Sequence, residues 1–480
     1  MMELLPKLPA VPVPGPRAVP LLGAHANVMR FFGDPVGVLL ALHREYGEIA
    51  SLIAGNPAWV AAFGPKYNQQ VLSDARLFHN SSDIPQKVPE DSAPMRLNNG
   101  ALTALNGDGH RRVRRLVMPA FSRPAVATYR DEMVKVAERV LSGWRVGETR
   151  NVSSLMMELT LCVAMQCLYG VDVSRQADEL GTLSQSYLGG MLSVGAMLLP
   201  VRLPGLPYAR FLDVAERFER RILQLIAERR AHPSDGRDVL SLLVQARDED
   251  GSTLMDAELE GQVAVLLIAS HETTSHTLSW TLFLLSQHPE VLGALVEELD
   301  AKLGGAAPTL EQLAQLPLLD AVVKESMRLL PATPFLFFRR ATGSFELGPY
   351  TLPEKATLLL SPLVTHRDPA LYPEPLRFRP ERWKTLSPGT YEYLPFGAGP
   401  RMCIGASFAT MALRVLLALL VQRFRFTLAP QARISRQVRG ITLGPKHGLP
   451  MRIDAQDRRF APPGPVRGDI HELVQLPVRA

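Results

Sequence analysis

Apolar positions recur with helical spacing through much of the chain. From about residue 66 to residue 287 the periodicity is mostly helical, with loops expected near Ile84–Asn99 and Leu199–Pro207. The longest helix is predicted from about Leu254 to Gln287, with Thr253 and Asp256 as a capping-box pattern at its start. It is apolar on most faces, so we expect it to be buried and to span roughly 50 Å.

Short strand-like runs and a proline-rich stretch complete the pattern. A further helix is predicted at about Leu318–Leu330, and a last one starts just after Cys403 and runs to about Arg423. Strands are expected at Glu48–Ile53, Ala58–Phe63, Phe345–Leu347, Tyr350–Leu352 and Thr357–Ser361, followed by a meander from Pro362 to Pro395. The pattern predicts a mainly α fold with small β-sheets.

We find no linker or repeat that would divide the 480 residues, so a single large domain is expected. It covers residues 25–454, between a proline-rich N-terminal arm (1–24) and a peripheral C-terminal tail (455–480). The N-terminal residues show no signal peptide, and no transmembrane segment is expected. A removed anchor stays open, because the proline-rich arm also resembles the hinge that follows microsomal anchors.

Charge and cysteine content narrow the function classes. A formal charge of +5 is mild for this length and does not indicate nucleic-acid binding. Cys162 and Cys167 lie in an apolar stretch and are expected to be core residues. Nothing suggests a disulfide framework, so a reducing compartment, the cytoplasm, is expected.

The third cysteine lies in a different context, the segment FGAGPRMCIG at Phe396–Gly405. A glycine-rich loop brings Cys403 to the start of an apolar helix, where free N–H groups favour an anion and lower a thiol pKa. Arg401 could pair with an acidic group of a ligand. A buried structural cysteine is the alternative, but it leaves the glycines and Arg401 unexplained.

This segment resembles the haem-binding loop of the cytochrome P450 superfamily, Phe-Gly-x-Gly-x-Arg-x-Cys-x-Gly, and the likeness runs from about Pro14 to Met451. The resemblance implies the fold of that family, with the long helix crossing haem b (iron protoporphyrin IX). It implies that Cys403 is the axial ligand of the iron, and that Phe396, Gly397 and Gly405 shape its loop. Thiolate ligation favours O–O cleavage in this family.

The segment ASHETT, residues 269–274, lies within the longest predicted helix. Ala269 and Thr273 share a helical face, and the Thr273 hydroxyl can bond back to the Ala269 carbonyl, leaving a polar notch. A satisfied polar cluster in a buried helix is the alternative. The segment resembles the oxygen-binding signature of the family, with Ser270 in place of a glycine. This implies that Thr273 stabilises bound oxygen and that Glu272 belongs to a proton relay.

Two further pairs have helical spacing. Glu325 and Arg328 are three residues apart, and the resemblance implies a structural triad with Arg382, which Trp383 follows in place of a phenylalanine. The other pair is His110 and Arg114, to which the resemblance gives the haem propionates, together with Arg339 and Arg401. Arg111, Arg112 and Arg115 could form a docking patch for an acidic electron donor. His110 as an axial ligand has no supporting motif.

The resemblance implies a soluble, bacterial-type monooxygenase, a monomer, that inserts one atom of O₂ into a hydrophobic substrate by hydroxylation or epoxidation. Electrons from NAD(P)H would come through a ferredoxin or flavodoxin with its reductase. The pocket would be lined by Leu266, Ala269, Phe335, Leu336 and Ile441, which suits a fatty acid, terpenoid, steroid or polyketide. The alternatives are a haem-thiolate isomerase, dehydratase or peroxygenase without external electrons, and a non-catalytic haem protein.

Overall fold

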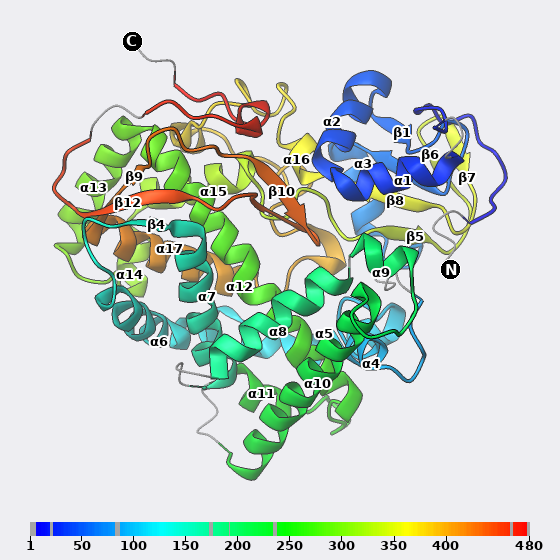
Figure 1. Ribbon diagram of the computed structural model, residues 1–480, viewed down its shortest axis with the longest axis horizontal. Helices are drawn as coiled ribbons and strands as arrows, with labels where there is room; N and C mark the ends of the chain where they lie inside the picture. The colour runs from blue at the N-terminus through cyan, green and yellow to red at the C-terminus, as the bar shows by residue number, and fades with distance from the viewer. Residues whose placement is uncertain are drawn as a thin grey trace.

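The computed structural model describes residues 6–19, 23–81, 87–171, 176–191, 193–233, 238–460 and 464–477. It shows a mainly helical molecule with small sheets at its edges (Figure 1). The helices are α1 (Gly23–Gly33), α2 (Pro35–Tyr46), α3 (Pro65–Ser73), α4 (Ala93–Asn99), α5 (Gly107–Val117), α6 (Arg123–Ser142), α7 (Val152–Tyr169), α8 (Gln176–Met191), α9 (Val194–Leu198), α10 (Pro207–Ala231), α11 (Val239–Gln245), α12 (Asp256–Gln287), α13 (Pro289–Leu303), α14 (Leu310–Leu313), α15 (Pro317–Leu329), α16 (Pro362–Thr365) and α17 (Ala406–Arg423), with 3₁₀ turns at Met118–Phe121, Pro380–Lys384, Gly399–Arg401 and Asp469–Glu472. The strands are β1 (Ile49–Ser51), β2 (Trp59–Ala62), β3 (Phe78–Asn80), β4 (Thr149–Asn151), β5 (Arg339–Ala341), β6 (Phe345–Leu347), β7 (Tyr350–Leu352), β8 (Thr357–Leu360), β9 (Phe424–Leu428), β10 (Arg436–Arg439), β11 (Thr442–Pro445) and β12 (Pro450–Ala455).

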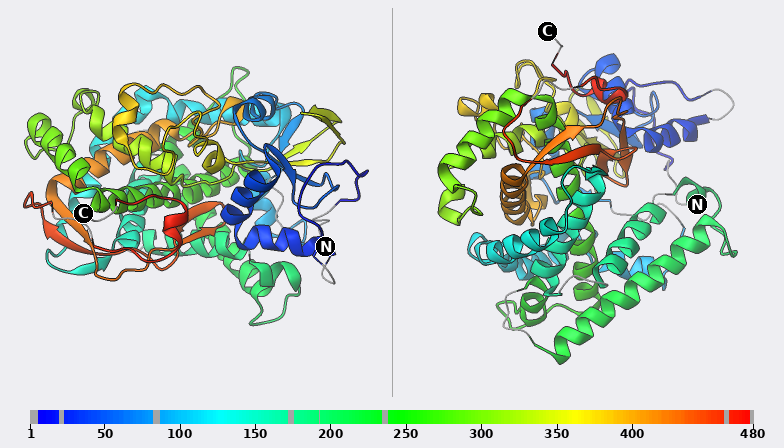
Figure 2. Two further views of the ribbon diagram at one scale, coloured as in Figure 1. Left: turned by 90° about the horizontal axis from the view of Figure 1, so that it is seen from above. Right: turned by 60° about the vertical axis from the view of Figure 1, so that its left-hand side comes forward.

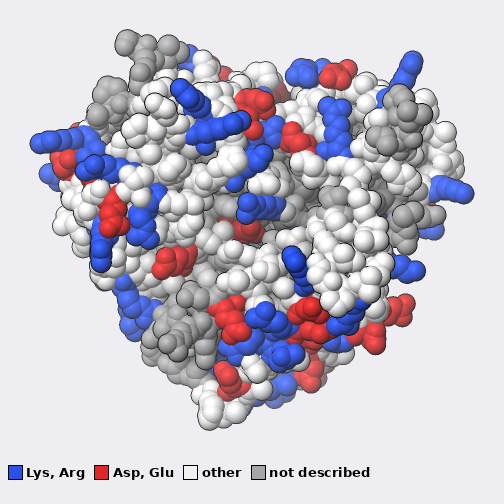
Figure 3. Space-filling view, viewed as in Figure 1, with Lys and Arg blue, Asp and Glu red and all other residues white. Residues whose placement is uncertain are grey.

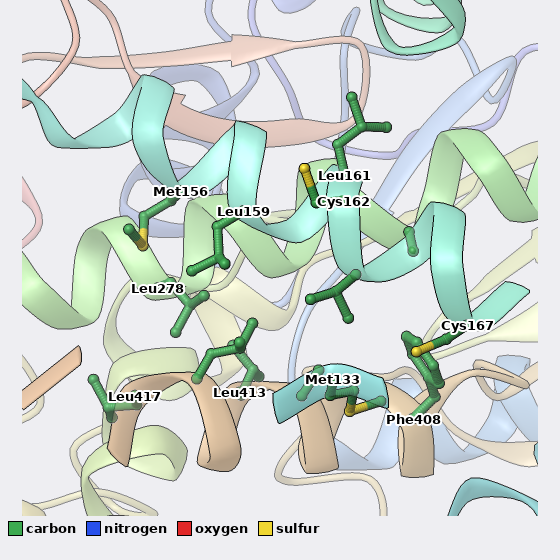
Figure 4. Packing of buried hydrophobic residues seen from close by; sticks show 14 of the residues in the cluster. Met133, Met156, Leu159, Leu161, Cys162, Cys167, Leu278, Phe408, Leu413 and Leu417 are labelled. Atoms are coloured by element: carbon green, nitrogen blue, oxygen red, sulfur yellow. The ribbon is translucent and has the colours of Figure 1, made fainter. Parts of the chain in front are cut away.

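The long helix α12 runs through the core, as predicted. It begins two residues later than expected, and its cap is the Glu258 carboxylate, which accepts a hydrogen bond from the Met255 N–H at 2.9 Å. The Thr253–Asp256 cap was therefore wrong. Cys162 and Cys167 of α7 lie among apolar side chains of α6, α12 and α17, as Figure 4 shows, which confirms them as core residues.

The strands divide into predicted and unpredicted ones. The hairpin of β1 and β2 is confirmed and joins a five-stranded sheet in the order β1-β2-β8-β5-β3. The three-stranded sheet β4-β12-β9 and the hairpin of β10 and β11 were not predicted. The loop expected near Ile84–Asn99 is in part a helix, since α4 covers Ala93–Asn99, while residues 82–86 lie outside the described residues.

Both terminal segments pack on the domain. In the arm, Val13 is buried, and the Ser51 N–H donates to the Pro14 carbonyl at 2.7 Å. The described part of the C-terminal tail crosses the molecule (Figure 2, red), and its Ile470, Leu473 and Val474 are fully buried. The prediction of a peripheral tail was therefore wrong at these three residues, because three scattered apolar residues give no periodic signal, while the other described residues of 464–477 are exposed or half-buried.

Two described helices, α7 and α17, are long and apolar enough to cross a membrane by length and composition alone. Of their apolar windows, 72% and 56% respectively are buried inside the protein, where both helices pack in the core (Figure 4). Core helices of this kind pass the same test, so the finding is weak evidence for a membrane span.

Candidate active site

The backbone conformation of the cysteine loop requires glycine at two positions. The Cys403 N–H donates to the Phe396 carbonyl at 2.9 Å, which closes the loop just before α17 begins at Ala406. Gly397 and Gly399 have φ values of +67° and +70°. A Cβ on Gly399 would also overlap the carbonyl oxygen of a residue in α3, so only glycine fits there.

Cys403 keeps solvent-exposed surface, although most of the space around its side chain is filled by protein atoms. Burial raises the pKa of its thiol, opposed by the Gly405 N–H and by the positive charge of Arg114. The start of α17 therefore does lower this pKa, through the N–H of its N-cap residue Gly405, but the desolvation of the thiol outweighs it. A bound metal cation would deprotonate a coordinating thiol outright.

The notch predicted on α12 is present. The Thr273 hydroxyl donates to the Ala269 carbonyl at 2.9 Å, as expected. Ala269 is exposed and Leu266 and Thr273 are half-buried, so these three residues form an accessible stripe along one face of a mostly buried helix. The Ser270 hydroxyl bonds to the Leu267 carbonyl of its own helix at 3.2 Å.

Glu272 lies next to this stripe on α12, and its carboxyl is half-buried. Burial raises its pKa to about 6, opposed by a hydrogen bond from Thr442 and by the charge of Arg439. A carboxyl of this kind exchanges protons readily near neutral pH. The two partners lie on β10 and β11, strands that the sequence did not reveal.

The cations assigned to the propionates form one cluster. His110 and Arg339 are each 5% exposed, and Arg401 is half-buried. Burial, and to a lesser degree the neighbouring charge of Arg401, lowers the pKa of Arg339 to about 10. Burial and Arg114 lower the pKa of Arg401 to about 10 in the same way. Burial and the surrounding arginines, Arg401 foremost, lower the pKa of His110 to about 4, so its imidazole is neutral near pH 7.

The three arginines of this cluster lack acidic partners among the described residues. Arg114 donates to the Met402 carbonyl at 2.9 Å, and Arg401 donates to the Asn106 side chain, while the Arg401 Nε atom is buried with no hydrogen-bond partner in the described part of the chain. Buried positive charges that repel one another call for an anionic ligand. The carboxylates of a haem satisfy that need, and Cys403 supplies the sulfur, so these residues fit a haem.

The structural triad assembles as predicted. Glu325 and Arg328 are fully buried and joined by two hydrogen bonds of 2.9 Å, and Arg382 Nε donates to Glu325 at 3.0 Å. Trp383 adds a bond that sequence reasoning missed, since its indole N–H donates to Glu325 at 3.0 Å. Arg328 also binds the carbonyls of His366 and of two meander residues, so the triad fixes the meander that leads to the cysteine loop.

The pocket residues fare differently. Leu266, Leu336 and Ile441 are half-buried and retain accessible surface. Phe335 is only 3% exposed, and its ring stacks on Phe338 in an aromatic cluster, so it offers almost no surface to a pocket. Sequence spacing could not show this, because adjacent side chains of an extended segment point to opposite sides.

The predicted docking patch on α5 is wrong for Arg112, which pairs with the buried Glu258 at 2.8 Å. Arg111 and Arg115 are exposed, but each pairs with an aspartate. On the face seen in Figure 3, basic and acidic groups are interspersed. A cavity of 390 Å³ lies beside the propionate cluster and is lined by Arg76, Arg111, His110 and Arg401, with Asp74 as the acidic lining residue. The sequence analysis did not identify Arg76 as a residue that lines a cavity beside the site.

Fold and site together define a protein built to hold haem through a cysteine. The chain belongs to the cytochrome P450 family, whose model matches residues 13–449. Membership of this family implies haem-thiolate chemistry.

Among curated relatives, cyclooctatin synthase of Streptomyces melanosporofaciens is 35% identical, covering 91% of this chain and 94% of its own. Pentalenene oxygenase of Streptomyces avermitilis is 30% identical, covering 92% and 97%. Among solved structures, a retinoic acid-bound cyanobacterial member superposes with a TM-score of 0.81 at 24% identity, covering 94% of this chain and all of that one. The cytochrome P450DA heme domain superposes with a TM-score of 0.79 at 26% identity, covering 94% and 99%.

Proposed function

We propose that this protein is a monooxygenase that inserts one oxygen atom from O₂ into a hydrophobic substrate, by hydroxylation or epoxidation. The observation that carries the proposal is the pairing of a Cys403 loop suited to haem with an intact Thr273–Glu272 pair on α12. An isomerase, dehydratase or peroxygenase that takes no external electrons has little use for a proton relay, and neither has a non-catalytic haem protein.

Each residue of the site has a distinct task in this proposal. The bound haem supplies oxygen activation at a thiolate-ligated iron. Cys403 holds the iron, and Arg114, Arg339, Arg401 and His110 hold the propionates.

Three residues of α12 serve the oxygen side. Ala269 leaves space beside the helix backbone. The Thr273 hydroxyl gives its own proton to the Ala269 carbonyl, so its oxygen is held at this space as a hydrogen-bond acceptor for a group that carries the proton to be transferred. Glu272, with a pKa of about 6, resupplies protons near neutral pH. Thr273 and Glu272 therefore serve proton transfer, and neither needs to contact the substrate.

We propose a terpenoid as the substrate. The pocket residues Leu266, Leu336 and Ile441 are apolar and bind such a molecule without polar partners. The relatives named for their reactions include a cyclooctat-9-en-7-ol 5-monooxygenase, 32% identical, and pentalenene oxygenase. The two names describe oxygenation of cyclooctat-9-en-7-ol and of pentalenene, and a pocket lined by aliphatic side chains suits a largely apolar substrate of this kind.

Electrons would come from NAD(P)H through a separate ferredoxin or flavodoxin with its reductase, in the cytoplasm, to a monomeric enzyme. The cavity lined by Arg76, Arg111 and Arg401 is positively charged and adjoins the propionate cluster. An acidic donor would be attracted to this part of the surface by charge complementarity.

The decisive experiment incubates the purified holoenzyme with NAD(P)H, a ferredoxin with its reductase, and a panel of cyclic terpenes. The spin-state change of the iron reports binding, and mass spectrometry reports product. Product that needs NAD(P)H and gains one atom from ¹⁸O₂ supports the proposal. Product formed without reductant, or from hydrogen peroxide alone, supports the rival enzymes. A Cys403→Ser variant that keeps the wild-type spectrum with carbon monoxide would contradict the assignment of the ligand.

A further inference from the structure

The C-terminal tail, residues 464–477, is fixed to the domain by backbone contacts as well as by its buried side chains. The Ile434 N–H donates to the Arg467 carbonyl at 2.7 Å, and the next residue, Gly468, has a φ of +111°. A Cβ on Gly468 would collide with the Ile434 carbonyl oxygen, so the chain passes this point with no room for a side chain. The tail follows residue 449, where the family match ends.

The tail binds the meander directly. The Gln475 N–H donates to the Leu376 carbonyl at 2.8 Å. The neighbouring carbonyls of Pro375 and Arg377 accept hydrogen bonds from Arg328 of the structural triad, at 2.8 and 3.2 Å. Three consecutive carbonyls of the meander are therefore held, one by the tail and two by the triad. Figure 1 shows the tail (red) beside the loops of the meander (yellow).

A half-buried arginine of the meander makes a second link to the tail. Arg367 donates to the Leu473 carbonyl of the tail at 3.0 Å, and to the Leu329 carbonyl at the end of α15 at 2.7 Å. The helix α15 carries Glu325 and Arg328 of the triad. Arg367 has no acidic partner among the described residues, and its Nε atom is buried with no hydrogen-bond partner there. Its guanidinium therefore depends on carbonyl oxygens, and the tail supplies one of them.

We propose that the tail is a positioning element of the haem-thiolate site: residues 467–475 hold the meander so that Cys403 stays in place to bind the iron. The meander ends at Pro395, and the carbonyl of the next residue, Phe396, accepts the Cys403 N–H at 2.9 Å. A displaced meander therefore displaces the cysteine loop. The inference concerns haem retention and does not depend on the reaction proposed above.

The test releases the tail where it enters the domain. Gly468→Ala adds a Cβ where there is no room, on a backbone that favours glycine, whereas Gly464→Ala adds one that meets nothing within 4 Å. Hydrogen exchange followed by mass spectrometry should show faster exchange of residues 469–475 in Gly468→Ala alone, because the Gln475 N–H loses its acceptor. Haem transfer from the ferric holoenzyme to apomyoglobin should become roughly tenfold faster in Gly468→Ala and keep the wild-type rate in Gly464→Ala.

Two further variants separate positioning from a general loss of stability. Arg367→Met removes the guanidinium that links the tail to α15 and leaves the tail sequence unchanged, so haem transfer should again accelerate. Leu225→Ala removes buried methyl groups from α10, at the opposite end of the molecule from the tail in Figure 1. It should lower the urea midpoint and leave haem transfer unchanged. The carbon monoxide spectrum, which reports the thiolate ligand, should lose part of its wild-type form in Gly468→Ala and keep it in Leu225→Ala.

Faster haem transfer in both Gly468→Ala and Arg367→Met, with wild-type rates in the two controls, supports the positioning role of the tail. If neither variant speeds haem transfer, the role is overturned, whether or not the tail exchanges faster. If Leu225→Ala speeds haem transfer as much as Gly468→Ala does at an equal loss of stability, the tail contributes only general stability, and the role is overturned as well.

Discussion

Replacing Glu260 by glutamine should stabilise the protein strongly above neutral pH and only slightly in acid. Glu260 of α12 is 7% exposed and lies beside Glu219 of α10, which is 8% exposed. Arg96 of α4 binds Glu219 with two hydrogen bonds, of 2.5 and 2.7 Å. The Glu260 Oε1 atom is buried with no hydrogen-bond partner among the described residues, so this cluster contains one carboxyl more than its arginine neutralises.

The magnitude follows from the pKa of Glu260. Burial, and then the charge of Glu219, raises it from 4.5 to about 7. Between these pH values the folded state binds more protons than the unfolded state, so stability falls as pH rises through this window and stays low above it. The shift corresponds to about 3 kcal/mol above neutral pH, a cost that belongs to the Glu219–Glu260 pair.

Glutamine keeps the shape of the protonated acid and can donate its amide N–H to Glu219. We expect Glu260→Gln to gain about 3 kcal/mol at about pH 8 and about 1 kcal/mol at about pH 5, where the wild-type carboxyl is already protonated in the folded state. Urea unfolding at both pH values measures this gain. Glu216→Gln, which alters an exposed carboxylate of the same helix α10, should change little at either pH. A gain in Glu260→Gln that is equal at both pH values, or a loss at about pH 8, would refute the reasoning.

Three further outcomes are expected. Arg339→Met should weaken haem retention by roughly 10- to 100-fold, measured by haem transfer to apomyoglobin, and raise the melting temperature of the haem-free protein, because an unpaired buried charge is removed. Gly399→Ala should prevent haem incorporation, since its φ is +70° and its Cβ has no space, whereas Gly389→Ala, with nothing nearer than 3.4 Å, should bind haem with a normal spectrum. Trp383→Phe should lower the free energy of unfolding by about 1 kcal/mol in urea titrations through loss of its bond to Glu325; an unchanged midpoint would mean that this bond contributes nothing.

Much of the site was predictable because its motifs are contiguous. The loop around Cys403 and the Ala269–Thr273 notch each lie within ten residues or fewer of chain, where local geometry dictates the outcome. The back-bond from Thr273 and the pairing of Glu325 with Arg328 depend only on helical spacing, and both are present. The family resemblance supplied Arg382 as their distant partner.

The predictions that failed concern contacts between residues that lie far apart in the sequence. Arg112 looked like a surface charge, yet it pairs with Glu258 of α12. The ring of Phe335 packs in an aromatic cluster and leaves almost no surface for the predicted pocket. The C-terminal residues Ile470 and Leu473 are buried, but the apolar pattern around them is too short to predict that this segment packs against the domain.

The amino-acid order alone determined the mainly helical architecture, the cysteine that binds iron in this family and the small-residue notch on α12, because hydrophobic period and local motifs act over a few turns of chain. Only the tertiary structure decided which charges remain unpaired and which distant residues act on the pKa of Glu272. Short strands such as β10 and β11 are stabilised by the surfaces they cover, and the proton affinity of a buried carboxyl depends on neighbours that folding brings from far along the chain.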